Sequence, residues 1–431
     1  MKSPGSRFAT ALVAAAALVP LAACAGSSGS GGDGKTEITL LTDNAETTVK
    51  PAKAVITAFE KANPDITVKL ESRPGGADGD NLVKTKLSTG DMEDVFWYNS
   101  GSLLQALSPE KTLVDLTNDP VLKDTDPSFL PTVTQNGKVY GAPVGTVMGG
   151  GILYNKDVYS KLGLQVPKTW SEFESNSDKI KAAGITAVIG SFKDTWTSQL
   201  FVLGDFHNVA TANPEFADEY TANKVKYATD PAAVKGFEKT AEAQQRGWLN
   251  RGAGSTTFDQ GMKLLASGKA AQYPLLTFPV GTLPADEAAK IGFFGIPGDD
   301  ASTHGATIWP GNGQYIPKTS KNVDAAKKFV AFVASVAGSD VYSSEAPPTG
   351  PYMVKGSKLP DSAPPVAKDL QAYIDAKTVT PALEFLSPVK GPSLEQITVA
   401  VATGQTSPKD GAAQYDADVA KQAKQLGLPG W

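Results

Sequence analysis

Hydrophobic and polar positions along residues 36–100 change period in a regular order. Apolar runs and alternating stretches predict strands, and apolar positions at helical spacing predict helices. The elements predicted in this way are a strand over 38–41, a helix over 49–59, a strand over 66–70, a helix over 82–87 and a strand over 95–98. The first helix is expected to end at Asn63, because the residue before Pro64 avoids the α region.

The rest of the chain repeats the theme. Thr169 and Glu172 have the spacing of a capping box, which predicts the start of a helix that ends near Gly184. The other predicted elements are strands over 151–154, 187–189 and 270–273, the last stopped by Pro274, and helices over 258–266 and 324–333. Strands and helices in alternation imply an α/β fold, a parallel sheet with helices on both faces. No linker divides the body, so two domains would share several chain crossings.

Composition narrows the class of protein. The chain has 431 residues, 41% of them hydrophobic and 20% charged, which is typical of a globular protein of two or three domains. A net charge of −5 argues against a dedicated nucleic-acid binder. The chain has one cysteine and two histidines, and a single cysteine excludes an internal disulfide. They leave only His207, His304 and carboxylates for a metal site, and no metal is expected.

The first 24 residues predict an export signal. Lys2 and Arg7 precede an apolar stretch over 8–23 that is short for a membrane span. The stretch ends in Leu-Ala-Ala-Cys at Cys24, which resembles the lipobox of bacterial lipoproteins. That resemblance implies a signal peptide over 1–23, a lipid on Cys24 and a Gly/Ser-rich tether over 24–35. The alternative is a plain signal peptide with an incidental cysteine.

Motifs for catalysis are missing from the sequence. It has no phosphate loop, no G-x-S-x-G elbow and no H-E-x-x-H zinc motif, and neither histidine has an adjacent nucleophile or orienting acid. Two of the carboxylates could still form a pair of the kind used by glycosidases, although the sequence favours no particular pair. A surface glycoside hydrolase therefore stays open as an alternative.

Aromatic residues with polar neighbours follow several predicted strands. Sugars stack their C–H faces on flat rings and need donors and acceptors for their hydroxyl groups, so this combination favours a carbohydrate groove. In open parallel sheets, ligands bind beyond the carboxyl ends of the strands. The residues concerned are Trp97, Tyr98, Trp196, Tyr273, Phe278 and Trp309, with Asn99, Ser100, Asp194, Thr277 and Asn312 among their polar neighbours.

Several stretches in a fixed order resemble family 1 extracellular solute-binding proteins, the sugar receptors of ABC importers, which include the maltose-binding proteins. The stretches are FEKANP (59–64), GDMEDVFW (90–97), GKVYGAP (137–143), LYNK (153–156), PKTWSEF (167–173) and GKAA (268–271). The resemblance implies a two-lobed periplasmic-binding-protein-like fold of type II, with a hinge of several crossings. It places crossings near 143–147, 307–311 and 345–350. Lobe 1 is then expected to comprise 36–145 plus 307–347, and lobe 2 to comprise 146–306 plus 348–431.

Carried over residue by residue, the resemblance implies a ligand-binding set. These residues are Asp43, Asn44 and Thr47 after the first strand; Trp97, Tyr98, Asn99 and Ser100 after the third; Asp194, Trp196, Thr277 and Phe278 in the second lobe; and Trp309 and Asn312 at the return crossing. A last contact is expected within 384–391. The tryptophan typical of maltose binders is absent near Phe278, so maltose itself is not implied.

The resemblance implies an extracytoplasmic receptor anchored to the cell membrane. It would be a monomer that captures a sugar in the form of an oligosaccharide by hinge closure and delivers it to an ABC transporter permease. No cofactor, no nucleic acid and no catalytic step are expected. The alternatives are the same fold with a polyol, amino sugar, peptide or phosphorylated ligand, a surface glycoside hydrolase, and a structural or adhesive lipoprotein.

Overall fold

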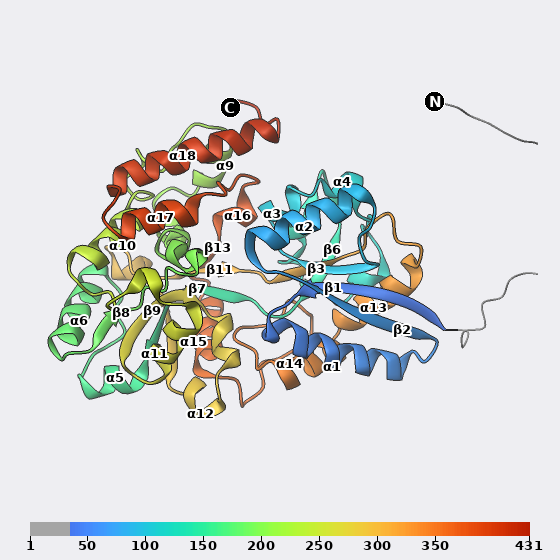
Figure 1. Ribbon diagram of the computed structural model, residues 1–431, viewed down its shortest axis with the longest axis horizontal. Helices are drawn as coiled ribbons and strands as arrows, with labels where there is room; N and C mark the ends of the chain where they lie inside the picture. Colours follow the sequence, from blue (N-terminus) through green and yellow to red (C-terminus); the bar gives the residue numbers. More distant parts are fainter. Residues whose placement is uncertain (1–34) are drawn as a thin grey trace, which may run out of the picture. The chain divides into compact units, whose positions relative to one another are not determined.

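Two β-sheets organise residues 35–431, the part of the chain that this computed structural model describes (Figure 1). The first sheet has the strand order β2-β1-β3-β12-β6. Its strands are β1 (Thr36–Asp43), β2 (Ile66–Arg73), β3 (Val95–Tyr98), β6 (Gly141–Val144) and β12 (Asn312–Tyr315). Strands β1, β2 and β3 are parallel, whereas β12 is antiparallel to both β3 and β6.

The second sheet has the order β13-β11-β7-β9-β8, and β10 also pairs with β7. Its strands are β7 (Met148–Asn155), β8 (Thr186–Val188), β9 (Ala270–Leu276), β10 (Ile291–Gly295), β11 (Ala306–Trp309) and β13 (Val379–Pro381). Strand β7 is antiparallel to β9, β10 and β11. A short hairpin of β4 (Thr134–Gln135) and β5 (Lys138–Val139) lies outside both sheets.

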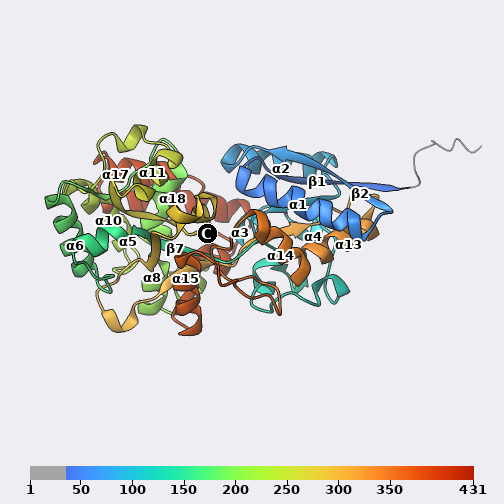
Figure 2. The same cartoon turned by 90° about the horizontal axis from the view of Figure 1, so that it is seen from below.

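Helices cover the sheets. Around the first sheet lie α1 (Glu46–Ala62), α2 (Gly76–Thr89), α3 (Ser102–Gln105), α4 (Pro109–Thr112), α13 (Val323–Val333) and α14 (Val336–Glu345). The others are α5 (Lys156–Lys161), α6 (Trp170–Ala182), α7 (Leu200–Leu203), α8 (Phe206–Ala212), α9 (Phe216–Thr221), α10 (Lys235–Gln245), α11 (Phe258–Ala266), α12 (Ala285–Ala288), α15 (Pro365–Asp375), α16 (Leu383–Leu386), α17 (Leu394–Ala402) and α18 (Pro408–Gln425). Figure 1 shows α2 and α1 on opposite faces of the first sheet, and Figure 2 shows α1 beside α14.

Local sequence explains where the helices begin and end. Helix α1 buries Val55 and Phe59, and the Phe59 ring meets the edge of the Phe329 ring of α13 with centroids 5.1 Å apart. Its predicted end at Asn63 is confirmed, as is the capping box at the start of α6. The two sheets and the helices that cover them confirm the α/β fold class predicted from the strand and helix pattern.

Two details of the predicted strands are wrong. The sheets are mixed rather than parallel, because β7 and β12 follow directly from strands of the other sheet and so run against their neighbours. Strand β9 continues through Pro274 to Leu276. Beyond Gln272 its only neighbour is β7, since the pairing with β8 has ended. The side of β9 on which Pro274 lacks an N–H has no partner strand at this position, so no ladder hydrogen bond is lost.

The predicted signal peptide (1–23), Cys24 and residues 25–34 of the tether lie outside the described residues. None of the helices within 35–431 combines the length and the apolar character needed to cross a membrane. Residues Thr36–Trp431 form one unit by their contacts, so the lobe boundaries stay a prediction. The sheets assign β11, including Thr307, to the second sheet, and the residues that pass between the sheets here are Pro310 and Gly311.

Candidate functional site

The two sheets are joined at the ends of their strands by two short crossings. Strand β6 leads through residues 145–147 into β7, and β11 leads through Pro310 and Gly311 into β12. Gly145 and Gly311 have positive φ angles of 77° and 99°, which favour glycine. The crossings lie side by side, because a Cβ on Gly311 would be 3.3 Å from the carbonyl oxygen of Thr146. Side chains after these strand ends therefore share one region.

The turn after β1 is held by Asp43. The Asp43 carboxylate accepts hydrogen bonds from the backbone N–H of Ala45 (2.9 Å) and from the Thr48 hydroxyl (3.0 Å). Asn44 is exposed and Thr47 is half-buried. Asp43 thus fixes the start of α1, and Asn44 is the predicted residue of this turn that is open to solvent.

Trp97 and Tyr98 point to opposite faces of the first sheet, because successive strand residues alternate. Trp97 is 4% exposed and packs with α1 and α13, near the Tyr342 ring. Tyr98 is 1% exposed and packs against the guanidinium of Arg73. Trp97 therefore has no exposed ring face for stacking in this structure, contrary to the role implied for it.

Ser100 connects the end of β3 to the second crossing. Its hydroxyl donates to the carbonyl of Gly311 at 2.9 Å. The neighbouring Asn99 side chain is exposed, while its carbonyl accepts from the Tyr315 hydroxyl at 3.1 Å. Asn312, at the start of β12, is also exposed. These contacts place Asn99 and Asn312 as available amides beside the crossing.

An aromatic platform of Trp196, Phe258 and Phe278 lies beyond the ends of β8 and β9. The ring centroids are 5.4 Å apart for Trp196 and Phe258, 6.2 Å for Trp196 and Phe278, and 6.4 Å for Phe258 and Phe278. All three rings are half-buried. The Asp194 carboxylate accepts from the backbone N–H of Phe258 at 2.6 Å and so joins the platform to α11. Half-exposed rings of this kind suit the apolar face of a sugar.

Thr277 and Trp309 are held inside the second sheet. Thr277 is fully buried and bonds in both directions with the backbone of Gly149. Trp309 is 7% exposed, and its indole N–H donates to the Glu384 carboxylate. Glu384 also pairs with Lys390 at 3.0 Å. The predicted contact segment 384–391 therefore meets the second crossing through Glu384.

The remaining features of the described chain are its acidic and histidine side chains and its cavities. Within residues 35–431, no three His, Cys, Asp or Glu side chains lie close enough together to hold a metal ion. Two small cavities are lined by residues other than the three platform rings. One is lined by Val144, Tyr342 and Tyr352, and the other by Phe201 and Thr240, among others.

Comparison with known proteins decides the family. Residues 42–339 match the family described as bacterial extracellular solute-binding proteins. The chain belongs to this family. The solute-binding protein is 27% identical over 331 residues to the multiple sugar-binding protein of Streptococcus mutans serotype c, with 72% of this chain and 74% of that protein covered. It is 24% identical over 371 residues to the melibiose/raffinose/stachyose-binding protein of Bacillus subtilis (strain 168), with 79% and 78% covered.

A solved structure confirms the two-lobed fold of the solute-binding protein. A chitin oligosaccharide binding protein superposes with a TM-score of 0.78 at 22% identity, over 90% of this chain and 99% of that one. The predicted family resemblance is thereby confirmed. The ligand-binding set carried over from it stays a prediction.

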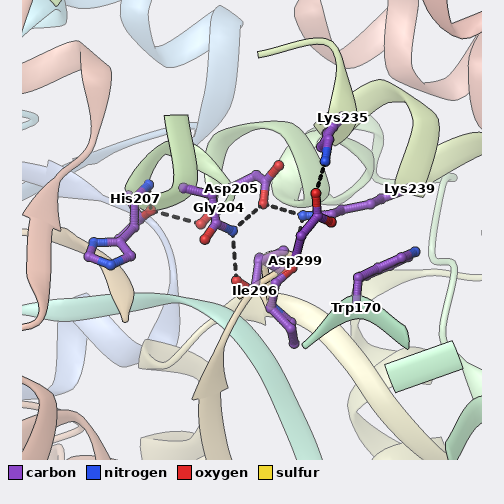
Figure 3. Close-up of polar contacts among 12 residues, drawn as sticks. Trp170, Gly204, Asp205, His207, Lys235, Lys239, Ile296 and Asp299 are labelled. Atoms are coloured by element: carbon purple, nitrogen blue, oxygen red, sulfur yellow. Dashed lines mark hydrogen bonds and ion pairs between the residues drawn. The ribbon is translucent and has the colours of Figure 1, made fainter. Parts of the chain in front are cut away.

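A buried ion pair in the solute-binding protein belongs to the packing of its second half (Figure 3). Lys239 of α10 is 3% exposed and lies 2.5 Å from the carboxylate of Asp205. Lys239 also donates to the carbonyl of Pro297 (2.9 Å), and Asn208 donates to Asp205 (2.7 Å) and to Ile296 (2.9 Å). The pair joins α10, the turn before α8 and the loop after β10.

The sequence did not point to Phe258 or Glu384 individually as residues of the candidate site. Phe258 follows a capping box of Thr257 and Gln260 at the start of α11, so the sequence carried a signal for its place at a helix end. The packing of Phe258 against Trp196 depends on where α11 packs against the second sheet, which no local pattern encodes. Glu384 lies within the predicted segment, but its bond to Trp309 joins residues far apart in the chain.

Proposed function

We propose that this solute-binding protein is an extracytoplasmic receptor. It captures a sugar in the form of an oligosaccharide and delivers it to the permease of an ABC transporter. The aromatic platform carries the proposal, because half-buried rings after the strands of the second sheet suit the apolar face of a sugar. The exposed amides of Asn99 and Asn312 at the second crossing supply donors and acceptors for its hydroxyl groups. Family membership and the relatives named as sugar-binding proteins support it. Neither relative is named as a glycoside hydrolase, so no observation favours that alternative.

Capture proceeds by hinge closure in this proposal. The adjacent crossings with positive-φ glycines support a hinge at Gly145 and Gly311. A sugar that touches both strand edges binds the closed state more tightly than the open state and shifts the population toward it. The closed form of a monomer then presents both halves to the permease at once.

Membrane anchoring through Cys24 is part of the proposal. The support is the sequence Leu-Ala-Ala-Cys after an apolar stretch, with the only cysteine of the chain at its end. Metabolic labelling with palmitate tests it in a bacterial host that processes lipoproteins. The protein is expected to incorporate label, and the Cys24→Ser variant is expected not to. Equal labelling of both proteins would contradict the anchor.

Thermal unfolding of the chain from Gly34 onward, screened against mono- and oligosaccharides, tests the receptor function. A ligand at 100 times its Kd stabilises the native state by about 2.7 kcal/mol and raises the Tm by a few degrees. A sugar that raises the Tm and is recovered unchanged supports a receptor. A flat response to every sugar contradicts the carbohydrate ligand, and a sugar consumed during incubation supports the hydrolase.

A further inference from the structure

Arg73 is a buried cation at the carboxyl end of β2. The side chain is 5% exposed, and its guanidinium lies over the Tyr98 ring, 5.2 Å from the centroid. Within the described residues it makes a single hydrogen bond, from Nη1 to the carbonyl of Pro74 at 3.0 Å. Nε is buried without an acceptor. Nη2 also lacks an acceptor but keeps some contact with solvent.

Two other cations of low exposure within residues 35–431 have acidic partners. Lys239 pairs with Asp205, and the half-buried Arg246 lies within 4 Å of three carboxylates. Arg73 makes no ion pair within residues 35–431. An uncompensated buried charge costs several kcal/mol. A partner from outside the chain would recover that cost.

The chain around Arg73 fixes the position of its guanidinium. A Cβ on Gly79 would lie 2.5 Å from Nη1 and 1.9 Å from the carbonyl oxygen of Pro74, so only glycine lets the first turn of α2 close over the side chain. The Tyr98 ring also packs against the guanidinium. The guanidinium is thus held at the edge of the first sheet that faces the second sheet.

Two acidic residues lie near this strand edge, and neither forms an ion pair with Arg73 within the described residues. Asp43 is its register partner on β1, with its oxygens bonded to Ala45 and Thr48. Asp80 lies close to the Tyr98 hydroxyl and, after burial, is the next cause that raises the pKa of this phenol. Arg73 supplies donors and the two acidic residues supply acceptors, and the negative charges of these acidic residues oppose an anionic ligand at this edge. This arrangement suits neutral hydroxyl groups better than an acidic group.

We propose that Arg73 is a solute-binding residue whose guanidinium donates to oxygen atoms of a neutral sugar unit at the carboxyl edge of the first sheet. The proposal rests on the receptor function proposed above. It extends that function by naming a donor on the side opposite the aromatic platform, and by selecting neutral saccharides over uronic acids and sugar phosphates.

Calorimetric titration of the Arg73→Gln variant tests the proposal, using a neutral saccharide that binds the wild-type protein. The Kd is expected to rise roughly 10–100-fold, the loss of a hydrogen bond to a charged group. The Tm without sugar is expected to stay equal or to rise, because the variant removes an unpaired buried charge. Arg73→Lys keeps the charge and the aliphatic stem but not the fork, so it is expected to fold and to bind at least about tenfold more weakly.

Arg251→Gln is the matched control, since Arg251 is exposed, and it is expected to change neither Kd nor Tm. A purely structural Arg73 would give the reverse pattern, a lower Tm with an unchanged Kd, and that result would overturn the proposal. Tighter wild-type binding of the matching uronic acid or sugar phosphate would overturn the neutral selectivity. A wild-type protein that binds no saccharide contradicts the receptor function and the proposal together. Normal wild-type binding with an unchanged Arg73→Gln variant contradicts the role of Arg73 alone.

Discussion

At the scale of single residues, His304 is held in its neutral form. Its Nε2 meets the Tyr373 hydroxyl at 2.8 Å, and its Nδ1 is buried without a partner. Burial first, and then the nearby His207 and Lys168, lower the pKa of His304 to about 4, against a small opposing effect of Glu172. Between pH 6.5 and pH 4 the unfolded chain therefore binds a proton that the folded chain does not, and the free energy of unfolding falls as the pH falls.

The His304→Gln variant is expected to lose this part of the pH dependence. Urea unfolding at pH 7, 5.5 and 4.5 measures the difference in free energy of unfolding between the variant and the wild type. That difference is expected to shift in favour of the variant by up to about 3 kcal/mol as the pH falls to 4. Raised carboxylate pKa values, such as that of Asp205, act on both proteins alike and cancel. Parallel pH curves for the two proteins would contradict this assignment.

Of the three residues of the aromatic platform, Trp196 is expected to contribute most to sugar binding. Trp196→Ala removes the indole that stacks beside Phe278, and large rings in central contacts contribute about 2 kcal/mol or more. The Kd for the identified sugar is expected to rise about 30-fold in calorimetric titration. Trp431→Ala, which removes a ring packed against Tyr220, is the control and is expected to leave Kd unchanged. An unchanged Kd in Trp196→Ala would remove the platform from the site.

Sequence reasoning reached the strand ends of the site but not the side-chain directions there. Trp196 lies in the segment after β8, and Asn312 lies at the start of β12 beside the second crossing, because turn positions follow from element order. Their roles in binding stay a prediction. Thr277 is buried by a bond across the sheet to Gly149, and such a pairing between distant residues leaves no local pattern. Arg73 had no signal at all, since a single arginine at the end of a strand is ordinary in a sequence.

At the scale of elements, the Asp205–Lys239 pair holds α10 to the loop after β10 (Figure 3). Removing one partner leaves the other charge buried, so Lys239→Met and Asp205→Asn are each expected to lower the free energy of unfolding by about 3–5 kcal/mol. Urea unfolding measures the loss. Combining both substitutions is expected to cost less than the sum of the two. Lys50→Gln, which breaks an exposed pair with Glu46, is expected to leave the Tm unchanged.

Element order was predictable because apolar periodicity is local. The pattern gave α1, β2 and α13 without any tertiary information. Strand direction was not predictable in the same way, since β12 is antiparallel to β3 only because the chain returns from the second sheet. The continuation of β9 through Pro274 likewise depends on where β8 stops beside it.

At the scale of the whole molecule, the crossings at Gly145 and Gly311 predict a rotation of one half relative to the other. Small-angle X-ray scattering is expected to show a smaller radius of gyration when the identified sugar is added at saturation. The Trp196→Ala variant at the same sugar concentration is the control, and its radius is expected to change less, in proportion to its lower occupancy. An unchanged radius in the wild type with bound sugar would contradict closure.

The position of β12 also has a consequence for how the chain acquires its structure. Strand β12 lies between β3 and β6, although it follows both of them by a long stretch of sequence. A growing chain that has passed Val144 therefore holds two unjoined pieces of the first sheet, and their edges stay unpaired until Tyr315 has been made. Pairing of distant segments is slow because a long loop must close first. The late arrival of one strand thus keeps the first half from completing its structure until most of the second half has been synthesised.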